Sequence, residues 1–333
     1  MAVERPAGRP GRGNSLLMSA LRFAGYDMDY RTATPPPAAS TTTMPKDTES
    51  AAAAKGAAAA AVSAGGRYMH ALPADVEPAR ALLEQYSGIP AKDVDRHVYQ
   101  MRDKLWDVYP YACVGRFRFA SLEFAADAYY QVALFRLLQA QTEDDETRLL
   151  DVGCCVGQVL RKLAFDGVDS SRLFGTDVEP RFLDIGYDLF RDRDKFKGRF
   201  VLGDILEQSE DGNDALDELH AKMTFIHATS FFHLFTWDDQ VRAAIRMVRF
   251  LHPDRRDVML FGRQVGTMLP RDNGKAGSDK VYLHNAHSWQ RLWDEVGQRT
   301  GTRWKTTMEP TEKIETGATE SSLRKMTFCV LRA

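Results

Sequence analysis

From about residue 147 to the C-terminus, short apolar runs alternate with segments of helical periodicity. Apolar runs and helical patterns occupy, in order, residues 149–152, 158–165, 173–176, 180–190, 200–202, 223–227, 237–251, 258–261 and 288–296. A strand followed by a helix and another strand forms a crossover unit, and such units build a parallel sheet covered by helices on both faces. The sequence therefore predicts an α/β fold.

The chain divides into three regions of different composition. Residues 1–74 are rich in Gly, Pro, Ser, Thr and Ala, and they are predicted to be disordered because they bury little apolar surface. Residues 75–145 carry helical patterns and are predicted to form a lid. Residues 146–333 hold the sheet domain, which ends with strand-like runs at 304–308 and 326–331.

The composition restricts the class of partner. The chain has 44 Lys and Arg against 46 Asp and Glu, so its net charge of −2 produces no long-range field that would gather nucleic acid or a membrane surface. No apolar run reaches the length of about 18 residues that indicates a spanning helix. The 4 cysteines include no C-x-x-C pair, so no metal site is expected and a cytoplasmic location is predicted.

The most specific motif is a glycine-containing turn at 149–157, which reads LLDVGCCVG. In a parallel sheet this turn lies at the carboxyl edge, where glycine lets the backbone approach a ligand and helix-terminal amides point outward. Gly153, Cys154 and Gly157 are therefore expected to contact a small ligand. Asp151, which precedes the turn, would repel a diphosphate but attract the ammonium of an amino-acid tail.

Two further acids end the next two apolar runs. Asp177 has the spacing from the glycine turn of an acid that receives two ribose hydroxyls, with Glu179 as the alternative if the strand ends later. Asp204, Ile205 and Val178 suit an adenine slot, which needs a hydrogen-bond acceptor and apolar walls. Each acid alone is as readily a helix cap or a turn residue. The three together predict a nucleoside-containing cofactor.

The turn lacks the glycines of a dinucleotide site. Counted from Gly153, the G-x-G-x-x-G pattern requires glycine where the chain has Cys155 and Gln158. The pyrophosphate cradle is therefore missing, which disfavours a nicotinamide-dependent oxidoreductase.

At this motif the sequence resembles the class I S-adenosylmethionine-dependent methyltransferases, whose first motif is an acid followed by G-x-G-x-G. Cys155 replaces the middle glycine, which leaves the shape of the turn open. Over roughly residues 76–333 the chain is similar to fungal methyltransferases of secondary-metabolite clusters, which act on meroterpenoid and other polyketide-derived products. The segments that carry this likeness are YSGIP at 86–90, GRFRF at 115–119, DVGCC at 151–155, RKL at 161–163, GYDLFRD at 186–192 and HLFTW at 233–237.

The resemblance implies a Rossmann-like, mostly parallel sheet of seven strands with an antiparallel C-terminal strand, and S-adenosyl-L-methionine as the cofactor. It also implies methyl transfer to a carboxyl or hydroxyl oxygen of a small apolar natural product. The residues that would hold the cofactor are Asp177 and Val178 at the ribose and adenine, Asp204 and Ile205 at the adenine, and His227 and Ala228 beside the sulfonium.

The candidate catalytic base is His233, which lies just beyond the fourth apolar run. A hydroxyl acceptor needs a proton acceptor nearby, whereas a carboxyl acceptor is already ionised at neutral pH. The alternative interpretation, which the frequent structural use of histidine favours, is a helix-capping or partly buried residue.

Other side chains are candidates for the acceptor site. The segment 115–119 is predicted to be a loop or a short extended stretch that lines a site. His284 and His287 lie ahead of a helix in a region that could face the acceptor, and His287 or Ser288 is as readily the cap of that helix. Candidates to clamp an acceptor carboxylate, or to stay solvated, are Arg116, Arg118 and Arg263. Candidates for apolar walls, or for ordinary core positions, are Phe117, Phe119, Tyr130, Phe231 and Trp289.

Two rival functions stay open at this point. One is the nicotinamide-dependent oxidoreductase, and the other is a regulator that binds S-adenosylmethionine without catalysis, which Cys155 makes conceivable. The sequence assigns no oligomeric state.

Overall fold

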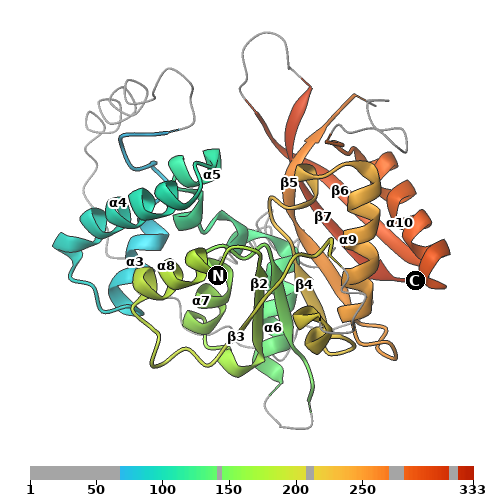
Figure 1. Cartoon of the computed structure of the whole chain (residues 1–333), viewed down its shortest axis with the longest axis horizontal. Helices are drawn as coiled ribbons and strands as arrows, with labels where there is room; N and C mark the ends of the chain where they lie inside the picture. Colours follow the sequence, from blue (N-terminus) through green and yellow to red (C-terminus); the bar gives the residue numbers. More distant parts are fainter. Residues whose placement is uncertain (1–67, 141–144, 208–213, 270–280, 315–321) are drawn as a thin grey trace, which may run out of the picture.

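A seven-stranded sheet forms the centre of the molecule (Figure 1). The computed structural model describes residues 68–140, 145–207, 214–269, 281–314 and 322–333. The strands, from one edge to the other, are β3 (Arg199–Leu202), β2 (Leu173–Asp177), β1 (Leu149–Val152), β4 (Phe225–His227), β5 (Met259–Thr267), β7 (Leu323–Arg332) and β6 (Trp304–Lys313). β7 is antiparallel to both of its neighbours and the other pairs are parallel. The predicted Rossmann-like sheet with an antiparallel C-terminal strand is confirmed.

Helices cover both faces of this sheet, as Figure 1 shows. The α-helices are α3 (Glu77–Gln85), α4 (Ala91–Val108), α5 (Ala112–Gly115), α6 (Ala128–Gln139), α7 (Gln158–Phe165), α8 (Pro180–Phe190), α9 (Trp237–Phe250) and α10 (Ala286–Thr300). The 3-10 turns are η1 (Arg118–Ala120), η2 (Glu123–Ala126), η3 (Ser170–Arg172), η4 (Ala215–Leu219) and η5 (Phe232–Leu234). The N-terminal helices share one core with α7 and α8, and α9 and α10 share a second core with the other face.

The structure differs from the sequence prediction mainly where pairing partners are distant. β5 continues to Thr267, well past the predicted run at 258–261, because it pairs with β7 as far as Leu323. The segment 115–119 is not extended: it runs from the end of α5 into η1, and Phe117 is left-handed with φ 58°. The backbone N–H groups of Gly115, Arg116 and Phe117 donate to carbonyls three or four residues earlier, which closes helical turns.

The ordered N-terminal region begins before the predicted boundary. Met69 N–H donates to the Gly115 carbonyl at 2.9 Å, and the Tyr68 ring lies edge-on to Trp106 with centroids 4.9 Å apart. The described chain therefore packs from residue 68, ahead of residue 75, where the lid was predicted to start. Residues 1–67, which were also predicted to be disordered, lie outside the described residues.

A buried ion pair joins the glycine turn to the N-terminal helices. Arg161 Nε lies 2.9 Å from Asp192 Oδ2 and Nη2 lies 3.1 Å from Oδ1, and both side chains are fully buried. Tyr86 donates its hydroxyl to Asp192 Oδ2 at 2.9 Å, and Arg161 also donates to the Val156 carbonyl at 3.3 Å. Aromatic rings surround the guanidinium, namely Tyr187, Phe190, Phe196 and Phe200.

We expect Arg161→Met to destabilise the protein by about 3–5 kcal/mol, because it leaves the Asp192 carboxylate buried without its partner. Denaturant unfolding measures the effect. The matched control is Arg193→Met, which breaks the solvent-screened pair with Asp184 and should cost less than about 1 kcal/mol. Equal effects of the two substitutions would contradict this account of the pair.

Candidate active site

The structure brings the acids of three consecutive strands to one edge of the sheet. β1, β2 and β3 are neighbours and parallel, so Asp151, Asp177 and Asp204 all lie at or just beyond the carboxyl ends of these strands. β4 lies on the other side of β1, and His227 is directly opposite Asp151 in the register. The strand order reverses between β1 and β4, which is where ligands bind in open sheets of this kind.

The glycine turn has three left-handed residues. Gly153, Cys155 and Gly157 have φ angles of 69°, 49° and 66°. This conformation costs a non-glycine residue about 1–2 kcal/mol, so Cys155 is strained where the related motif has glycine. Its backbone N–H donates to Asp177 Oδ2 at 2.8 Å, which helps to hold the strained turn. Cys154 is buried beneath the turn and Gly153 is exposed.

Asp177 is held by backbone amides and is also largely buried. Its Oδ1 accepts the Glu179 N–H at 3.1 Å, and burial raises the pKa of the carboxyl above its usual value although these N–H groups act in the opposite direction. Glu179, the alternative ribose ligand, is engaged by Arg181 at 2.8 Å, and these hydrogen bonds lower its pKa to about 2. Both carboxylates are thus engaged, Asp177 by backbone N–H groups of the turn and Glu179 by the side chain of Arg181.

The candidate adenine slot combines an acid with apolar side chains. Val178 is 62% exposed and Leu202, at the end of β3, is also exposed, whereas Ile205 is buried. Asp204 Oδ1 accepts the Leu206 N–H at 2.9 Å, so this carboxylate also stabilises its own turn. Exposed apolar side chains beside an acid are the surface that a flat heterocycle covers.

Asp151 and His227 form a buried hydrogen-bonded pair. His227 Nδ1 lies 2.7 Å from Asp151 Oδ1, and His227 Nε2 lies 2.8 Å from Thr229 Oγ1. Asp151 is 3% exposed and His227 is 2% exposed. Ala228, the next residue, is fully buried and donates its N–H to the Phe261 carbonyl at 3.0 Å. Sequence reasoning missed Thr229, because only the tertiary structure places its hydroxyl on the ring of His227.

The segment after β4 packs against the glycine turn. A Cβ atom on Gly153 would lie 2.9 Å from Phe231 Cδ2, so the Phe231 ring lies directly beside this glycine. His233, in η5, has a buried Nδ1 without a hydrogen-bond partner among the described residues. Burial lowers its pKa to about 4, so the imidazole is neutral at neutral pH.

The arginine candidates for an acceptor clamp are engaged elsewhere. Arg263 Nε donates to Asp127 Oδ2 at 2.5 Å, and its Nη2 donates to the Glu123 carbonyl at 3.1 Å. Arg118 is exposed and pairs with Glu123 Oε1 at 3.3 Å. Arg116 is exposed. Arg263 therefore ties the N-terminal region to β5, a role that its position in the sequence did not indicate.

Most of the aromatic candidates belong to the core. Buried side chains within the two cores are Phe117, Phe119, Tyr130 and Trp289. His284 is buried as well: its Nε2 lies 2.9 Å from Gln240 Oε1 and its Nδ1 lies 3.1 Å from Ser288 Oγ. Helix α10 is capped by Asn285 in a capping box that includes Ser288 at its third position, so Ser288 belongs to the cap, and the N-cap residue is Asn285 rather than His287.

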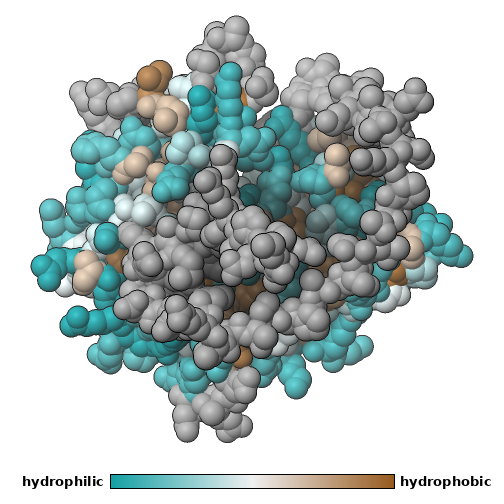
Figure 2. Space-filling view, turned by 180° about the vertical axis from the view of Figure 1, so that it is seen from behind, coloured by the Kyte–Doolittle hydropathy of each residue, from teal (hydrophilic) through white to brown (hydrophobic). Residues whose placement is uncertain are grey.

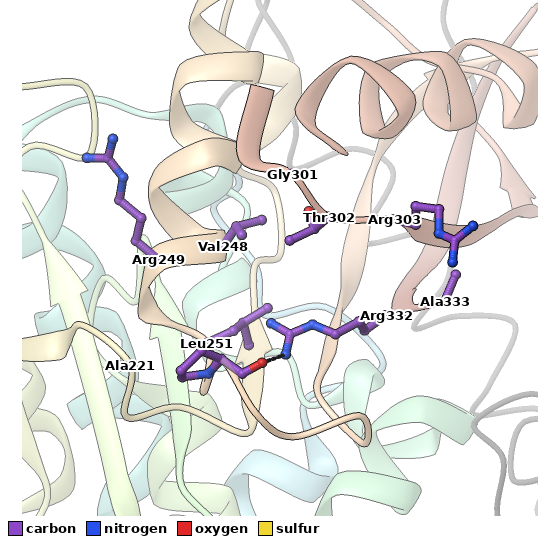
Figure 3. A pocket seen from close by; sticks show the side chains of 10 residues that line it. Ala221, Val248, Arg249, Leu251, Gly301, Thr302, Arg303, Arg332 and Ala333 are labelled. Carbon is purple, nitrogen blue, oxygen red and sulfur yellow. Dashed lines mark hydrogen bonds between the residues drawn. The ribbon is translucent and has the colours of Figure 1, made fainter. Parts of the chain in front are cut away.

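A cavity of about 400 Å³ lies at the opposite edge of the sheet (Figure 3). Its walls include Ala221, Leu251, Thr302 and Arg332, which precede β4, β5 and β6 or end β7. Arg332 donates to backbone carbonyls there, such as that of Arg255 at 2.8 Å. The cavity is therefore remote from the carboxyl edge and from the three acids.

Exposed apolar side chains gather around the carboxyl edge. They end β3, follow β2, β4 and β5, or precede α10, and they include Val178, Leu202, Leu234, Leu269 and Val281. Tyr111 lies near this rim, with its ring centroid 6.3 Å from that of Phe182, and burial raises its pKa with smaller contributions from Tyr109 and Asp177. Figure 2 shows the molecule from behind, with apolar side chains visible toward the middle of that face between hydrophilic flanks.

Two family models match the chain. The model described as the meroterpenoid methyltransferase N-terminal domain matches residues 68–120, and a methyltransferase domain matches residues 149–254. The O-methyltransferase phiE of Fungal sp. (strain ATCC 74256) is 39% identical over 241 residues, which cover 72% of this chain and 77% of phiE. The O-methyltransferase atr3 of Stereocaulon alpinum is 37% identical over 248 residues, or 72% of this chain and 68% of atr3.

The chain belongs to the meroterpenoid methyltransferase family. A further relative, the asnovolin E/chermesin D methyltransferase nvfJ of Aspergillus novofumigatus, is 34% identical over 257 residues, or 76% of this chain and 87% of nvfJ. The chain is thus a methyltransferase, and neither the oxidoreductase nor the non-catalytic regulator describes it. Within the ranges that the structure describes, no helix of this methyltransferase combines the length and apolar character needed to cross a bilayer.

The buried neutral His284 makes stability depend on pH. Burial lowers the pKa of His284 from 6.5 to about 3. Below pH 6.5 the unfolded chain therefore binds a proton that the folded protein does not bind. Stability is therefore lost as the pH falls from 6.5 toward 3, at up to about 1.4 kcal/mol per pH unit for one such group. His284→Gln should flatten this slope in denaturant unfolding at several pH values. His287→Gln, on the exposed start of α10, is the control and should leave the slope unchanged.

Proposed function

We propose that this methyltransferase uses S-adenosyl-L-methionine to methylate an oxygen, carboxyl or hydroxyl, of a small apolar natural product in fungal secondary metabolism of the meroterpenoid type. The observation that carries this proposal is the set of carboxylates at three consecutive strand ends around a glycine turn whose Gly153 is exposed. The printed names of phiE and atr3, both O-methyltransferases, support an oxygen acceptor.

The residues at the carboxyl edge fit this cofactor. Asp177 would hold the ribose hydroxyls, Val178 and Ile205 would line the adenine with Asp204, and Asp151 would face the ammonium. Gly153 presents an exposed backbone with no side chain, and a Cβ there would meet Phe231. Cys154 and Gly157 complete the turn. When bound, the sulfonium supplies an electrophilic methyl group.

The protein's task in such a transfer is to orient the two reactants and exclude water. In favourable intramolecular models, orientation alone lowers the barrier by roughly 7–11 kcal/mol. The exposed apolar rim, which includes Leu234 and Leu269, is suited to an apolar acceptor that covers the edge of the sheet. Helices α3 to α6 would form the predicted lid over the cofactor. Nucleic acid and membrane partners are not part of this proposal, and a cytoplasmic location stays a prediction.

His233 is the candidate proton acceptor for a hydroxyl substrate. Its imidazole is neutral and its buried Nδ1 has no partner among the described residues, so this nitrogen would accept the proton of an acceptor hydroxyl placed against it. Its pKa of about 4 makes it a weak base, which limits it to acceptors that are themselves acidic, such as phenols.

The function as a whole is tested by incubating the protein with methyl-labelled S-adenosylmethionine and an extract of the producing fungus. Mass spectrometry should find one labelled product or a small set, with the label on oxygen. Label on carbon or nitrogen, or no label in any product, would contradict the proposed oxygen transfer.

We expect Asp177→Ala to weaken binding of S-adenosylhomocysteine at least about tenfold, because the ribose loses its carboxylate acceptor. Isothermal titration calorimetry measures the affinity, and circular dichroism checks that the variant remains folded. Glu179→Gln is the control, since that carboxylate is bound to Arg181 and should be dispensable. Unchanged affinity in Asp177→Ala would remove the ribose assignment.

For a hydroxyl acceptor, His233→Gln should lower kcat by about 10²–10⁴-fold and leave the affinity for the cofactor unchanged. Steady-state kinetics with the identified acceptor measure both quantities. The wild-type rate should hold down to a pH near the histidine pKa of about 4, because the neutral form persists above it. An unchanged kcat would reject His233 as a base and indicate a carboxylate acceptor, which is already ionised.

A further inference from the structure

Both ring nitrogens of His227 are occupied by the protein itself. The ring is 2% exposed and lies between the carboxylate of Asp151, at 2.7 Å from Nδ1, and the hydroxyl of Thr229, at 2.8 Å from Nε2. A side chain with both polar atoms bonded inside the protein has no nitrogen left for a ligand. His227 therefore cannot reach a cofactor through a hydrogen bond of its own.

The directions of these hydrogen bonds are fixed from both ends. A carboxylate only accepts, so His227 Nδ1 carries the hydrogen that Asp151 receives. At the other end, the backbone N–H of Arg263 donates to Thr229 Oγ1 at 3.1 Å. The Thr229 oxygen thus accepts one hydrogen bond, and its own hydrogen is free to be donated to Nε2, the ring nitrogen that carries no hydrogen in this tautomer. The array holds the ring in one tautomer and one orientation.

This arrangement leaves one Asp151 oxygen for a ligand. Oδ1 receives the histidine N–H, and Oδ2 has no hydrogen-bond partner among the described residues. A carboxylate that is held by one oxygen presents the other in a defined direction, which favours a charge-assisted hydrogen bond to a cation.

The array is also packed against the N-terminal region. The Phe124 ring of η2 lies 6.0 Å from the His227 ring, and the Phe261 ring lies 5.3 Å from it on the β5 side. Arg263, whose backbone supports Thr229, binds Asp127 through its side chain. The orientation of His227 is therefore fixed by residues from β1, from the segment that follows β4, from β5 and from η2.

We propose that His227 is a positioning residue that acts through Asp151, fixing this carboxylate to receive the ammonium group of the cofactor's amino-acid tail, and that Thr229 fixes His227. This replaces direct contact of His227 with the sulfonium. The proposal rests on the proposed use of S-adenosylmethionine, and it concerns only the amino-acid half of that molecule.

The test compares two ligands that differ only in this half. S-adenosylhomocysteine carries the ammonium group, whereas 5′-methylthioadenosine keeps the nucleoside and the sulfur but lacks the amino-acid group. By calorimetry, His227→Leu should bind S-adenosylhomocysteine about tenfold more weakly, which corresponds to about 1.4 kcal/mol, and should bind 5′-methylthioadenosine as the wild type does. His227→Asn, whose amide nitrogen replaces Nδ1, should recover part of the loss.

A double variant keeps the test valid if the unpaired Asp151 destabilises His227→Leu. Asp151→Asn removes the charge. Adding His227→Leu to Asp151→Asn should not weaken the binding of S-adenosylhomocysteine any further, because the histidine acts only through the carboxylate. Thr229→Val should weaken the binding of S-adenosylhomocysteine by a smaller factor and leave the binding of 5′-methylthioadenosine unchanged. Thr229→Ser should bind S-adenosylhomocysteine with the wild-type affinity.

If His227→Leu weakened the binding of both ligands equally, the proposal would be overturned, since the histidine would then only support the fold of the site. Unchanged binding of both ligands would also overturn it, as would a further loss in the double variant. Failure of the wild-type protein to bind S-adenosylhomocysteine is a separate result, because it would contradict the proposed function before any variant is compared.

Discussion

The buried pair of Arg161 and Asp192 is the constraint on which the arrangement of the site depends. It lies beneath the glycine turn, where Arg161 also holds the Val156 carbonyl, and Asp192 receives the hydroxyl of Tyr86 from the N-terminal helices. Charges removed from water remain buried only if their partners stay in place. The turn, the end of α8 and the N-terminal helices are therefore fixed relative to one another by one interaction.

A second interaction helps a chain with cysteine in the glycine motif to keep the shape of the turn. Cys155 adopts a left-handed conformation, and its backbone N–H is received by Asp177. The same carboxylate is the candidate ribose ligand, so the residue that supports the strained turn also lies at the proposed nucleoside site. Strain at such a position persists because the surrounding structure holds it.

The fold could be predicted closely from local patterns, and the site only in part. The helices at 158–165 and 180–190 begin and end where the sequence indicated, since apolar periodicity marks a face and needs no knowledge of its partner. The carboxylates at the strand ends followed from the same alternation. Arg263 was expected to clamp an acceptor carboxylate or to stay solvated, because no local pattern shows that Asp127 lies beside it in the folded chain.

The sequence by itself determined the order of strands and helices and the residues that end each strand, because these depend on the spacing of apolar side chains along a few turns. The tertiary structure decided which of those residues are available. His227 contacts Asp151 on the neighbouring strand, and Thr229 accepts a hydrogen bond from the backbone of Arg263. These hydrogen bonds therefore exist only after the sheet has formed. Whether the polar atoms of a side chain are free to bind a ligand depends on partners that are distant in the sequence. The pattern of residues along the chain does not show which partners these are.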